Sequence, residues 1–274
     1  MLRQRALSAL VFVPLVLALA YLGGLIFELF WAAVLAFAGF EFVRMARRAG
    51  FQLSYPLTIL FILLIAFSRI KFEYQGDWIV FIGFLFAVSV VGLFQYEHGD
   101  EKAFSNLILH LFCFVYIGLF GAFAFSLNHG ETGENWLLLL TIGLVWLVDA
   151  GAYLIGSRFG KQTILPRLSP KKTLEGFLGG TLVGILFGAL LGWLLSARMS
   201  GLTPWSGALF GGIMGPAAFF GDAVMSLIKR TLGVKDTGNL LPGHGGVLDR
   251  LDSMLWAMAV GELFRQAILL GIFK

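Results

Sequence analysis

The chain alternates between long apolar stretches and short polar connections, and this pattern is the main signal in the sequence. A helix needs about 20 mostly apolar residues, within a range of roughly 17–25, to cross the hydrocarbon core of a bilayer. Nine stretches are candidate spans, with soft ends, at 6–22, 25–43, 55–68, 78–95, 104–126, 136–156, 176–195, 205–225 and 252–272. The pattern therefore predicts an all-α polytopic membrane protein of about nine transmembrane helices.

Two of these spans have features that need comment. The third is short, begins at Tyr55-Pro56, and requires Arg69 to extend its side chain to the membrane surface. The first follows the basic residues Arg3 and Arg5 and has the form of a signal peptide, but no small-x-small cleavage site follows it. We therefore expect the first span to be retained.

Composition agrees with the membrane assignment. Hydrophobic residues make up 58% of the 274 residues and charged residues 13%, whereas a soluble domain is about 45–50% apolar and about 25% charged. The single cysteine, Cys113, excludes a disulfide framework and a cysteine-based metal cluster. The net charge of +4 is too small to indicate nucleic-acid binding, so no nucleic acid is expected as a partner.

The positions of the basic residues predict the orientation, because loops rich in Lys and Arg stay in the cytoplasm. With the N-terminus in the cytoplasm, fifteen Lys and Arg residues fall on the inner side and four on the outer side. The outer four are Arg69, Lys71, Arg198 and Lys274, and Arg265 lies within the last span. This bias predicts a cytoplasmic N-terminus and a C-terminus outside.

Glycines recur at four-residue spacing in the seventh and eighth spans. They are Gly180, Gly184, Gly188 and Gly192 in one span, and Gly207, Gly211 and Gly215 in the next. Small residues at this spacing allow helix backbones to approach closely in lipid. We expect these two spans to pack tightly against each other.

Candidate chemistry is sparse in the first 135 residues. Glu28 and Glu41 are acids in or near the second span, where charges are costly and often functional, but both lie close to span ends that water can reach. A catalytic role is the less favoured interpretation for either. His110 and Cys113 are interpreted as packing residues.

Three segments of the C-terminal half carry more chemistry, and all face the cytoplasm in the predicted topology. In the first, Asp149 lies inside a span and needs a cation, a proton or a water-filled cavity, although a protonated structural Asp remains an alternative. The run from Gly156 to Lys161 resembles a nucleotide-binding P-loop, but it is one residue short and Gln162 replaces the required Ser or Thr. We reject the P-loop interpretation.

The second segment runs from Ser169 to Gly176. Ser169 before Pro170 predicts a helix start, which places Lys171 and Lys172 in the first helical turn, against the positive end of the helix dipole. Two lysines there suggest an anion such as phosphate, with anchoring at the membrane surface as the alternative.

The third segment, 221–252, is the densest in chemistry. A continued eighth helix would place four side chains on one face: Asp222, Ser226, Lys229 and Arg230. The run 242–246, which contains His244, Gly245 and Gly246, suits a loop that wraps phosphate, and Asp249 and Asp252 follow as the last span begins. Acids with bases and glycines fit a hard metal ion and polyphosphate. The alternatives are a helix cap for Asp249 and lipid-headgroup binding for the bases.

Here the sequence resembles the phosphatidate cytidylyltransferases, or CDP-diglyceride synthetases. The pattern Ser-x-hydrophobic-Lys-Arg, four residues, Lys-Asp-x-small, two residues, Leu-Pro-x-His-Gly-Gly-hydrophobic-x-Asp-Arg-hydrophobic-Asp fits at every defined position from Ser226 to Asp252. Residues 149–161 and 169–176 are similar to the family's secondary motifs, with Leu174 where an aromatic is common. The specific resemblance covers about 146–256.

The resemblance implies transfer of CMP from CTP to phosphatidate with Mg²⁺, in a bacterial inner (plasma) membrane. On this hypothesis Asp222 and Asp249 are catalytic and hold the metal, and Lys171 and Lys172 hold the triphosphate or the leaving pyrophosphate. The substrate-binding candidates are His244, Gly245, Gly246, Lys229, Arg230, Ser226, Arg250 and Asp149. Asp149, Asp236 and Asp252 are second-choice ligands or orienting groups.

The scarcity of candidate chemistry before residue 135 divides the chain into two predicted parts. We expect an N-terminal transmembrane bundle of about five helices over 1–135 and a catalytic bundle of about four over 136–274, with cytoplasmic motif loops. CTP, phosphatidate and the bilayer are the expected partners, and a homodimer remains open. Alternative functions are a CTP-dependent lipid kinase, a CDP-archaeol-type synthase or an ion-coupled transporter.

Overall fold

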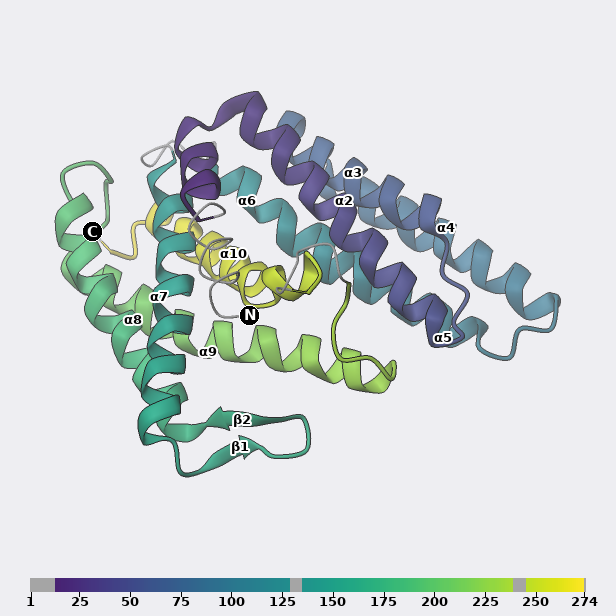
Figure 1. Ribbon diagram of the computed structural model, residues 1–274. Helices are drawn as coiled ribbons and strands as arrows, with labels where there is room; N and C mark the ends of the chain where they lie inside the picture. Colours follow the sequence, from purple (N-terminus) through teal and green to yellow (C-terminus); the bar gives the residue numbers. More distant parts are fainter. Residues whose placement is uncertain (1–12, 129–134, 239–244, 274) are drawn as a thin grey trace.

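The computed structural model describes residues 13–128, 135–238 and 245–273. The described chain folds into helices connected by short loops, as the apolar pattern predicts (Figure 1). Its N-terminal elements are α2 (Gly24–Arg48), α3 (Tyr55–Phe72), α4 (Asp77–Glu97), α5 (Ala103–Cys113), η1 (Phe114–Leu119) and α6 (Phe120–Asn128). Its C-terminal elements are α7 (Trp136–Phe159), β1 (Thr163–Leu165), β2 (Ser169–Thr173), α8 (Leu174–Leu195), α9 (Pro204–Thr231) and α10 (Leu248–Leu269).

Seven helical segments of the described chain are long and apolar enough to cross a membrane. They are α2, α3, α4, the continuous run Ala103–Asn128, α7, α8 and α9. Each coincides with one of the predicted spans from the second to the eighth. The structure therefore confirms an all-α polytopic membrane protein; the direction in which it crosses the membrane stays a prediction.

The two remaining predicted spans are also helical where they are described. The first is present from residue 13 onward as the shorter apolar helix Val13–Leu22. The ninth corresponds to α10, which carries Asp249, Arg250, Asp252, Glu262 and Arg265 and is not one of the seven. In Figure 1, α10 runs through the middle of the molecule, and it packs against α6, α7, α9 and α2.

Residues with short polar side chains cap the N-termini of three helices. The side chain of Ser54 accepts a hydrogen bond from Leu57 N at the start of α3, and Thr173 accepts one from Gly176 N at the start of α8. Thr203 and Ser206 form a reciprocal capping box at the start of α9. These caps satisfy backbone N–H groups that the first turn of a helix leaves without intrahelical partners.

The predicted tight packing of α8 and α9 is confirmed. A Cβ atom added at Gly184 or Gly188 would collide with backbone of α9, and one added at Gly207 or Gly211 would collide with backbone of α8. Every buried residue of α8 is a glycine. The two backbones therefore meet directly, as small residues allow in a membrane bundle, and this contact fixes one wall of the region described next.

Candidate functional site

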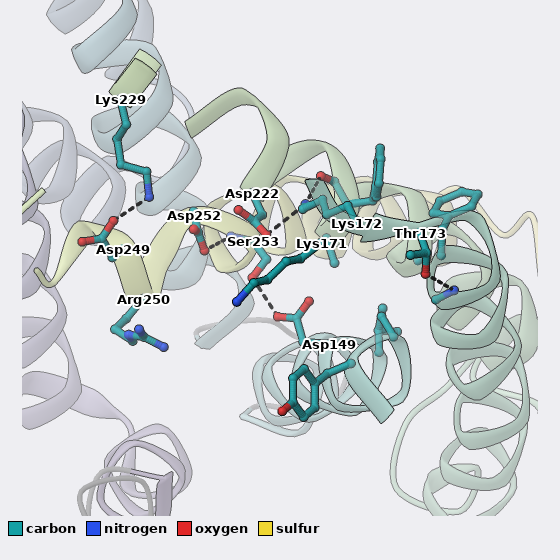
Figure 2. Close-up of a pocket in the computed structure, with 18 of the residues that line it drawn as sticks. Asp149, Lys171, Lys172, Thr173, Asp222, Lys229, Asp249, Arg250, Asp252 and Ser253 are labelled. Atoms are coloured by element: carbon teal, nitrogen blue, oxygen red, sulfur yellow. Dashed lines mark hydrogen bonds and ion pairs between the residues drawn. The ribbon is translucent and has the colours of Figure 1, made fainter. Parts of the chain in front are cut away.

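A cavity of about 560 Å³ opens between α7, β2, α8, α9 and α10. Figure 2 shows the side chains that line it, which come from segments far apart in the sequence. Nine of the lining residues are charged, namely Asp149, Lys171, Lys172, Asp222, Lys229, Asp236, Asp249, Arg250 and Asp252. Charges are costly inside a membrane bundle unless they are paired or solvated, so this concentration of charge makes the cavity the candidate functional site.

Asp149 reaches the cavity from the second half of α7. Its Oδ2 accepts a hydrogen bond of 2.9 Å from Ser253 Oγ on α10, and Tyr153, one turn further along α7, lines the same cavity. Gly156 of α7 packs closely against Thr173 and Gly176 at the start of α8. Because Gly156 has no side chain, α7 can lie close to the end of β2, the strand that carries Lys171 and Lys172.

The structure contradicts the predicted helix start at Ser169-Pro170. Ser169–Thr173 is strand β2, which pairs antiparallel with β1, and α8 begins only at Leu174. Thr173 is the residue that caps α8, because its backbone is extended and its side chain accepts from Gly176 N. Lys171 and Lys172 thus precede the helix, and the argument that they oppose the helix dipole was wrong.

Both lysines nevertheless reach the cavity. Lys172 Nζ forms an ion pair of 2.9 Å with Asp222 Oδ2, donates a 3.0 Å hydrogen bond to the carbonyl of Phe219, and lies 4.6 Å from the centre of the Phe219 ring. The Lys171 side chain is exposed and extends into the open space between Asp149 and Arg250 (Figure 2). Both lysines therefore line the cavity from strand β2, and the binding of phosphate by them stays a prediction.

Helix α9 continues beyond Arg230, as predicted, but its four predicted site residues do not all reach the cavity. Ser226 Oγ donates a 3.2 Å hydrogen bond to Asp222 Oδ1, although Ser226 does not line the cavity. Lys229 lines the cavity further along α9, whereas Arg230 is exposed and lies outside the lining. Asp222 and Lys229 therefore line the site, and Ser226 contacts it only through its hydrogen bond to Asp222.

Asp249 has the densest set of hydrogen bonds in the cavity. Its Oδ1 accepts from Lys229 Nζ at 2.7 Å. Its Oδ2 accepts from Thr237 N at 2.8 Å, Thr237 Oγ1 at 3.0 Å and Gly246 N at 3.0 Å. Burial alone would raise the pKa of this carboxyl, but the bonds from Lys229, Gly246 and Thr237 outweigh it and hold the pKa below its usual value.

The two glycines that follow His244 are explained by their close neighbours; His244 itself lies outside the described residues. Gly245 has a φ of +82°, and a Cβ atom there would lie 2.8 Å from Asp249 Oδ2. A Cβ atom at Gly246 would collide with Thr237 and with Glu41 of α2. The N–H of Gly246 is directed at Asp249, so in this structure the glycine pair packs around carboxylates.

The second-choice residues also gather at the cavity. Asp236 lines the cavity and is exposed. Asp252 points into the cavity beside Asp222 (Figure 2). The backbone carbonyl of Asp252 accepts a 3.2 Å hydrogen bond from Tyr116 Oη, which also bonds the carbonyl of Gly221. Tyr116, from the N-terminal part of the chain, thereby links α9 to α10 through the backbone next to Asp222 and at Asp252.

Sequence reasoning missed three residues that hold this arrangement together. Thr237 occupies an unspecified position of the signature, Ser253 follows the signature, and Tyr116 lies in an apolar span that contains several other aromatic residues. Glu41 was noticed only as an acid near a span end. The long-range partners of these residues leave no local signal, apart from the cost of a buried acid.

The cavity suits a hard divalent cation by its donor chemistry. Carboxylate oxygens from Asp222, Asp249, Asp252 and Asp149 face it, and Mg²⁺ prefers oxygen ligands. Within the described ranges, no three His, Cys, Asp or Glu residues form a ready-made metal-binding group. Mg²⁺ usually binds through one or two carboxylates together with substrate phosphates, so the residues present fit this ion.

Comparison with known proteins gives one consistent result. A family model described as the cytidylyltransferase family matches residues 3–268. A phosphatidate cytidylyltransferase of Mycobacterium bovis is 32% identical over 266 residues, covering 92% of this chain and 85% of the relative. Those of Staphylococcus epidermidis and Bacillus subtilis are each 30% identical over 259 residues, covering 93% of this chain and 96% and 94% of the relatives. The similarity thus extends well beyond the signature.

Proposed function

Because this chain belongs to the cytidylyltransferase family, we propose that it transfers CMP from CTP to phosphatidate and releases CDP-diacylglycerol and pyrophosphate. The observation that carries the proposal is the cavity between membrane helices, which collects five acids and four bases. A site for two phosphate-bearing substrates needs cations for the phosphates and carboxylates for a metal, and this cavity has both.

The reaction forms one bond and breaks one. A phosphate oxygen of phosphatidate attacks the α-phosphorus of CTP, and the bond between that phosphorus and the oxygen bridging to the β-phosphate breaks. The second pKa of a phosphate monoester is about 6, so the attacking oxygen is already largely ionised near neutral pH and no strong general base is required. Catalysis then depends on positioning and charge neutralisation.

The cavity residues supply that neutralisation by exchanging partners. Lys172 is paired with Asp222 and Lys229 with Asp249. When phosphates enter, each lysine can turn from its carboxylate toward a phosphate oxygen, and the carboxylates become available to the metal. Asp222 and Asp249 would then hold Mg²⁺, which supplies further neutralisation of phosphate charge when bound.

The lysines of β2 are assigned to the CTP side of the site. Lys171 extends freely into the cavity (Figure 2), and Lys172 is tethered to α9. We assign both to the triphosphate and the leaving pyrophosphate, and Lys229 to the lipid phosphate. Arg230, exposed outside the cavity lining, suits the approach of the headgroup rather than the reacting phosphates.

A membrane-embedded cavity must also admit a lipid. Tyr153 of α7 lines the cavity and is 73% exposed, so the cavity is open beside α7. Phosphatidate can enter there with its acyl chains in the bilayer, while CTP enters from water. We assign this end of the bundle to the cytoplasm because basic residues are in excess there, and the bacterial relatives support a bacterial inner membrane.

The test uses the purified chain reconstituted in lipid nanodiscs. Pyrophosphate release from CTP is measured with and without phosphatidate and Mg²⁺, and the lipid product is identified by mass spectrometry. The proposal predicts release only when all are present, with CDP-diacylglycerol as the product. A phosphorylated lipid with release of CDP would indicate a lipid kinase, and no reaction in protein shown to be folded would overturn the proposal.

A further inference from the structure

Glu41 of α2 is a buried acid that the reaction described above does not use. Its residue exposure is 0%, and it lies about 200 positions before the signature in the chain, yet the two are in contact. Its Oε2 accepts a hydrogen bond of 2.9 Å from Leu248 N, at the start of α10, and one of 3.2 Å from Thr237 Oγ1. A single carboxylate oxygen thus holds both ends of the segment 237–248.

Thr237 connects Glu41 to the catalytic acid. Its hydroxyl lies 3.2 Å from Glu41 Oε2 and 3.0 Å from Asp249 Oδ2, and its backbone N–H donates to the same Asp249 oxygen at 2.8 Å. The hydroxyl has one proton, which it shares between the two carboxylates or gives to one at a time. Glu41, Thr237 and Asp249 therefore form a continuous chain from α2 to the cavity.

The glycines of the signature are shaped around this contact. A Cβ atom at Gly238 or Gly246 would collide with the carboxylate of Glu41. These positions can therefore hold no larger residue while Glu41 remains where it is. The fit indicates that the loop and the acid are built to meet, rather than touching by chance.

The second carboxylate oxygen of Glu41, Oε1, makes no comparably close contact with the described residues, so the main interaction of Glu41 is the pair of hydrogen bonds that Oε2 accepts from Thr237 and Leu248. Within the described part of the chain, Oε1 has no hydrogen-bond partner, and Arg44 Nη2 approaches it only to 4.0 Å. Arg44 is partly exposed, so this ion pair is weak. The uncharged amide of Gln could present its oxygen to Thr237 and Leu248 and keep both loop bonds.

We propose that Glu41 is a positioning residue, through which the N-terminal bundle holds the described residues at the two ends of the segment 237–248 and fixes the orientation of Asp249. This gives the N-terminal helices a specific part in a reaction whose other groups lie in the C-terminal half. The inference rests on the proposed function for its consequence in turnover, but the loop contact can be tested independently of any activity.

Two pairs of variants separate hydrogen bonding from charge and from simple loss of folding. Glu41→Leu removes the acceptor, whereas Glu41→Gln keeps it. Thr237→Val removes the connecting hydroxyl at nearly constant shape, whereas Thr237→Ser keeps it. Glu28→Leu is the matched control, because Glu28 is also a buried acid of α2 but lies about 20 Å away along the helix, at 1.5 Å per residue.

Two measurements are made on each variant in nanodiscs, hydrogen exchange at the Gly246 and Leu248 amides and kcat with KM for both substrates. We expect faster exchange and a kcat lowered about 10–100-fold in Glu41→Leu, the range typical for loss of a group that orients a ligand. KM should change less than kcat. Thr237→Val should shift both measurements in the same direction, and Glu41→Gln, Thr237→Ser and Glu28→Leu should stay close to wild type.

Other results would overturn the inference. Unchanged exchange and kcat in both Glu41→Leu and Thr237→Val would show that the loop does not depend on this contact. Equal loss in Glu41→Gln and Glu41→Leu would show that Glu41 acts through its charge. If Glu41→Leu does not fold, the Thr237 pair decides. If the wild-type chain releases no pyrophosphate, the proposed function fails, while the exchange measurement still tests the contact.

Discussion

Asp249→Asn is the substitution whose structural and chemical effects should differ most. The asparagine keeps one oxygen, which can accept the three bonds that Asp249 Oδ2 accepts from Thr237 and Gly246. It loses the negative charge and turns an amide N–H₂ toward Lys229, whose Nζ now lies 2.7 Å from Oδ1. The fold therefore loses one charge-assisted hydrogen bond, which is worth about 1.5–3 kcal/mol.

The effect on turnover should be much larger. Asp249 is assigned to the metal, and loss of one preorganised charge-stabilising group typically costs about 10²–10³ in kcat. We expect a protein that inserts in the membrane and elutes as a single species, with kcat reduced by at least about 100-fold. Pyrophosphate release at saturating substrates measures kcat, and thermal unfolding followed by size-exclusion chromatography measures stability.

The control for Asp249→Asn is neutralisation of an acid outside the cavity. Glu97→Gln neutralises an exposed acid at the end of α4, away from the cavity, and should leave both measurements unchanged. Near-normal turnover by folded Asp249→Asn protein would remove Asp249 from the reaction. Failure of Asp249→Asn to fold would instead show that its role in holding the loop is larger than its hydrogen bonds indicate.

Two further predictions concern the lysines and the glycine contact. Lys171→Ala and Lys172→Ala should each raise KM for CTP, by about tenfold or more per lost charge-assisted hydrogen bond; steady-state kinetics with varied CTP measure this, and unchanged CTP kinetics in both would return them to membrane anchoring. Gly211→Ala should destabilise the fold by about 1–3 kcal/mol, because its Cβ would collide with backbone of α8. Gly143→Ala is the control for thermal unfolding, because a Cβ atom at Gly143 would meet open space. Equal unfolding midpoints for Gly211→Ala and Gly143→Ala would show that the close contact at Gly211 does not stabilise the fold.

The helices could be predicted from the sequence because the bilayer imposes a length and an apolar composition on each one. The close contact of α8 and α9 was predictable for a similar reason, since glycines at four-residue spacing leave a flat helix face. The signature acids and lysines were found because charge is rare elsewhere in the chain. These features depend on local sequence or on the membrane, and neither requires knowledge of the tertiary fold.

The errors and omissions arise where tertiary contacts decide. Ser169-Pro170 has the local form of a helix start, but pairing with Thr163–Leu165 keeps the segment extended until Thr173 caps the helix. Glu41 looked like an acid near a span end because its partners lie about 200 residues away. The glycines of the signature predict a phosphate-binding loop, and this stays a prediction; what the sequence did not indicate is that Gly246 makes room for the carboxylate of Glu41.

We propose that the charged cavity is where CTP is joined to phosphatidate. The most direct measurement is pyrophosphate release by the reconstituted wild-type chain, with the lipid product analysed in the same reaction. We expect pyrophosphate release that requires CTP, phosphatidate and Mg²⁺ together and yields one CDP-diacylglycerol per pyrophosphate. Release that does not depend on phosphatidate, or no release from folded protein with all three present, would contradict it.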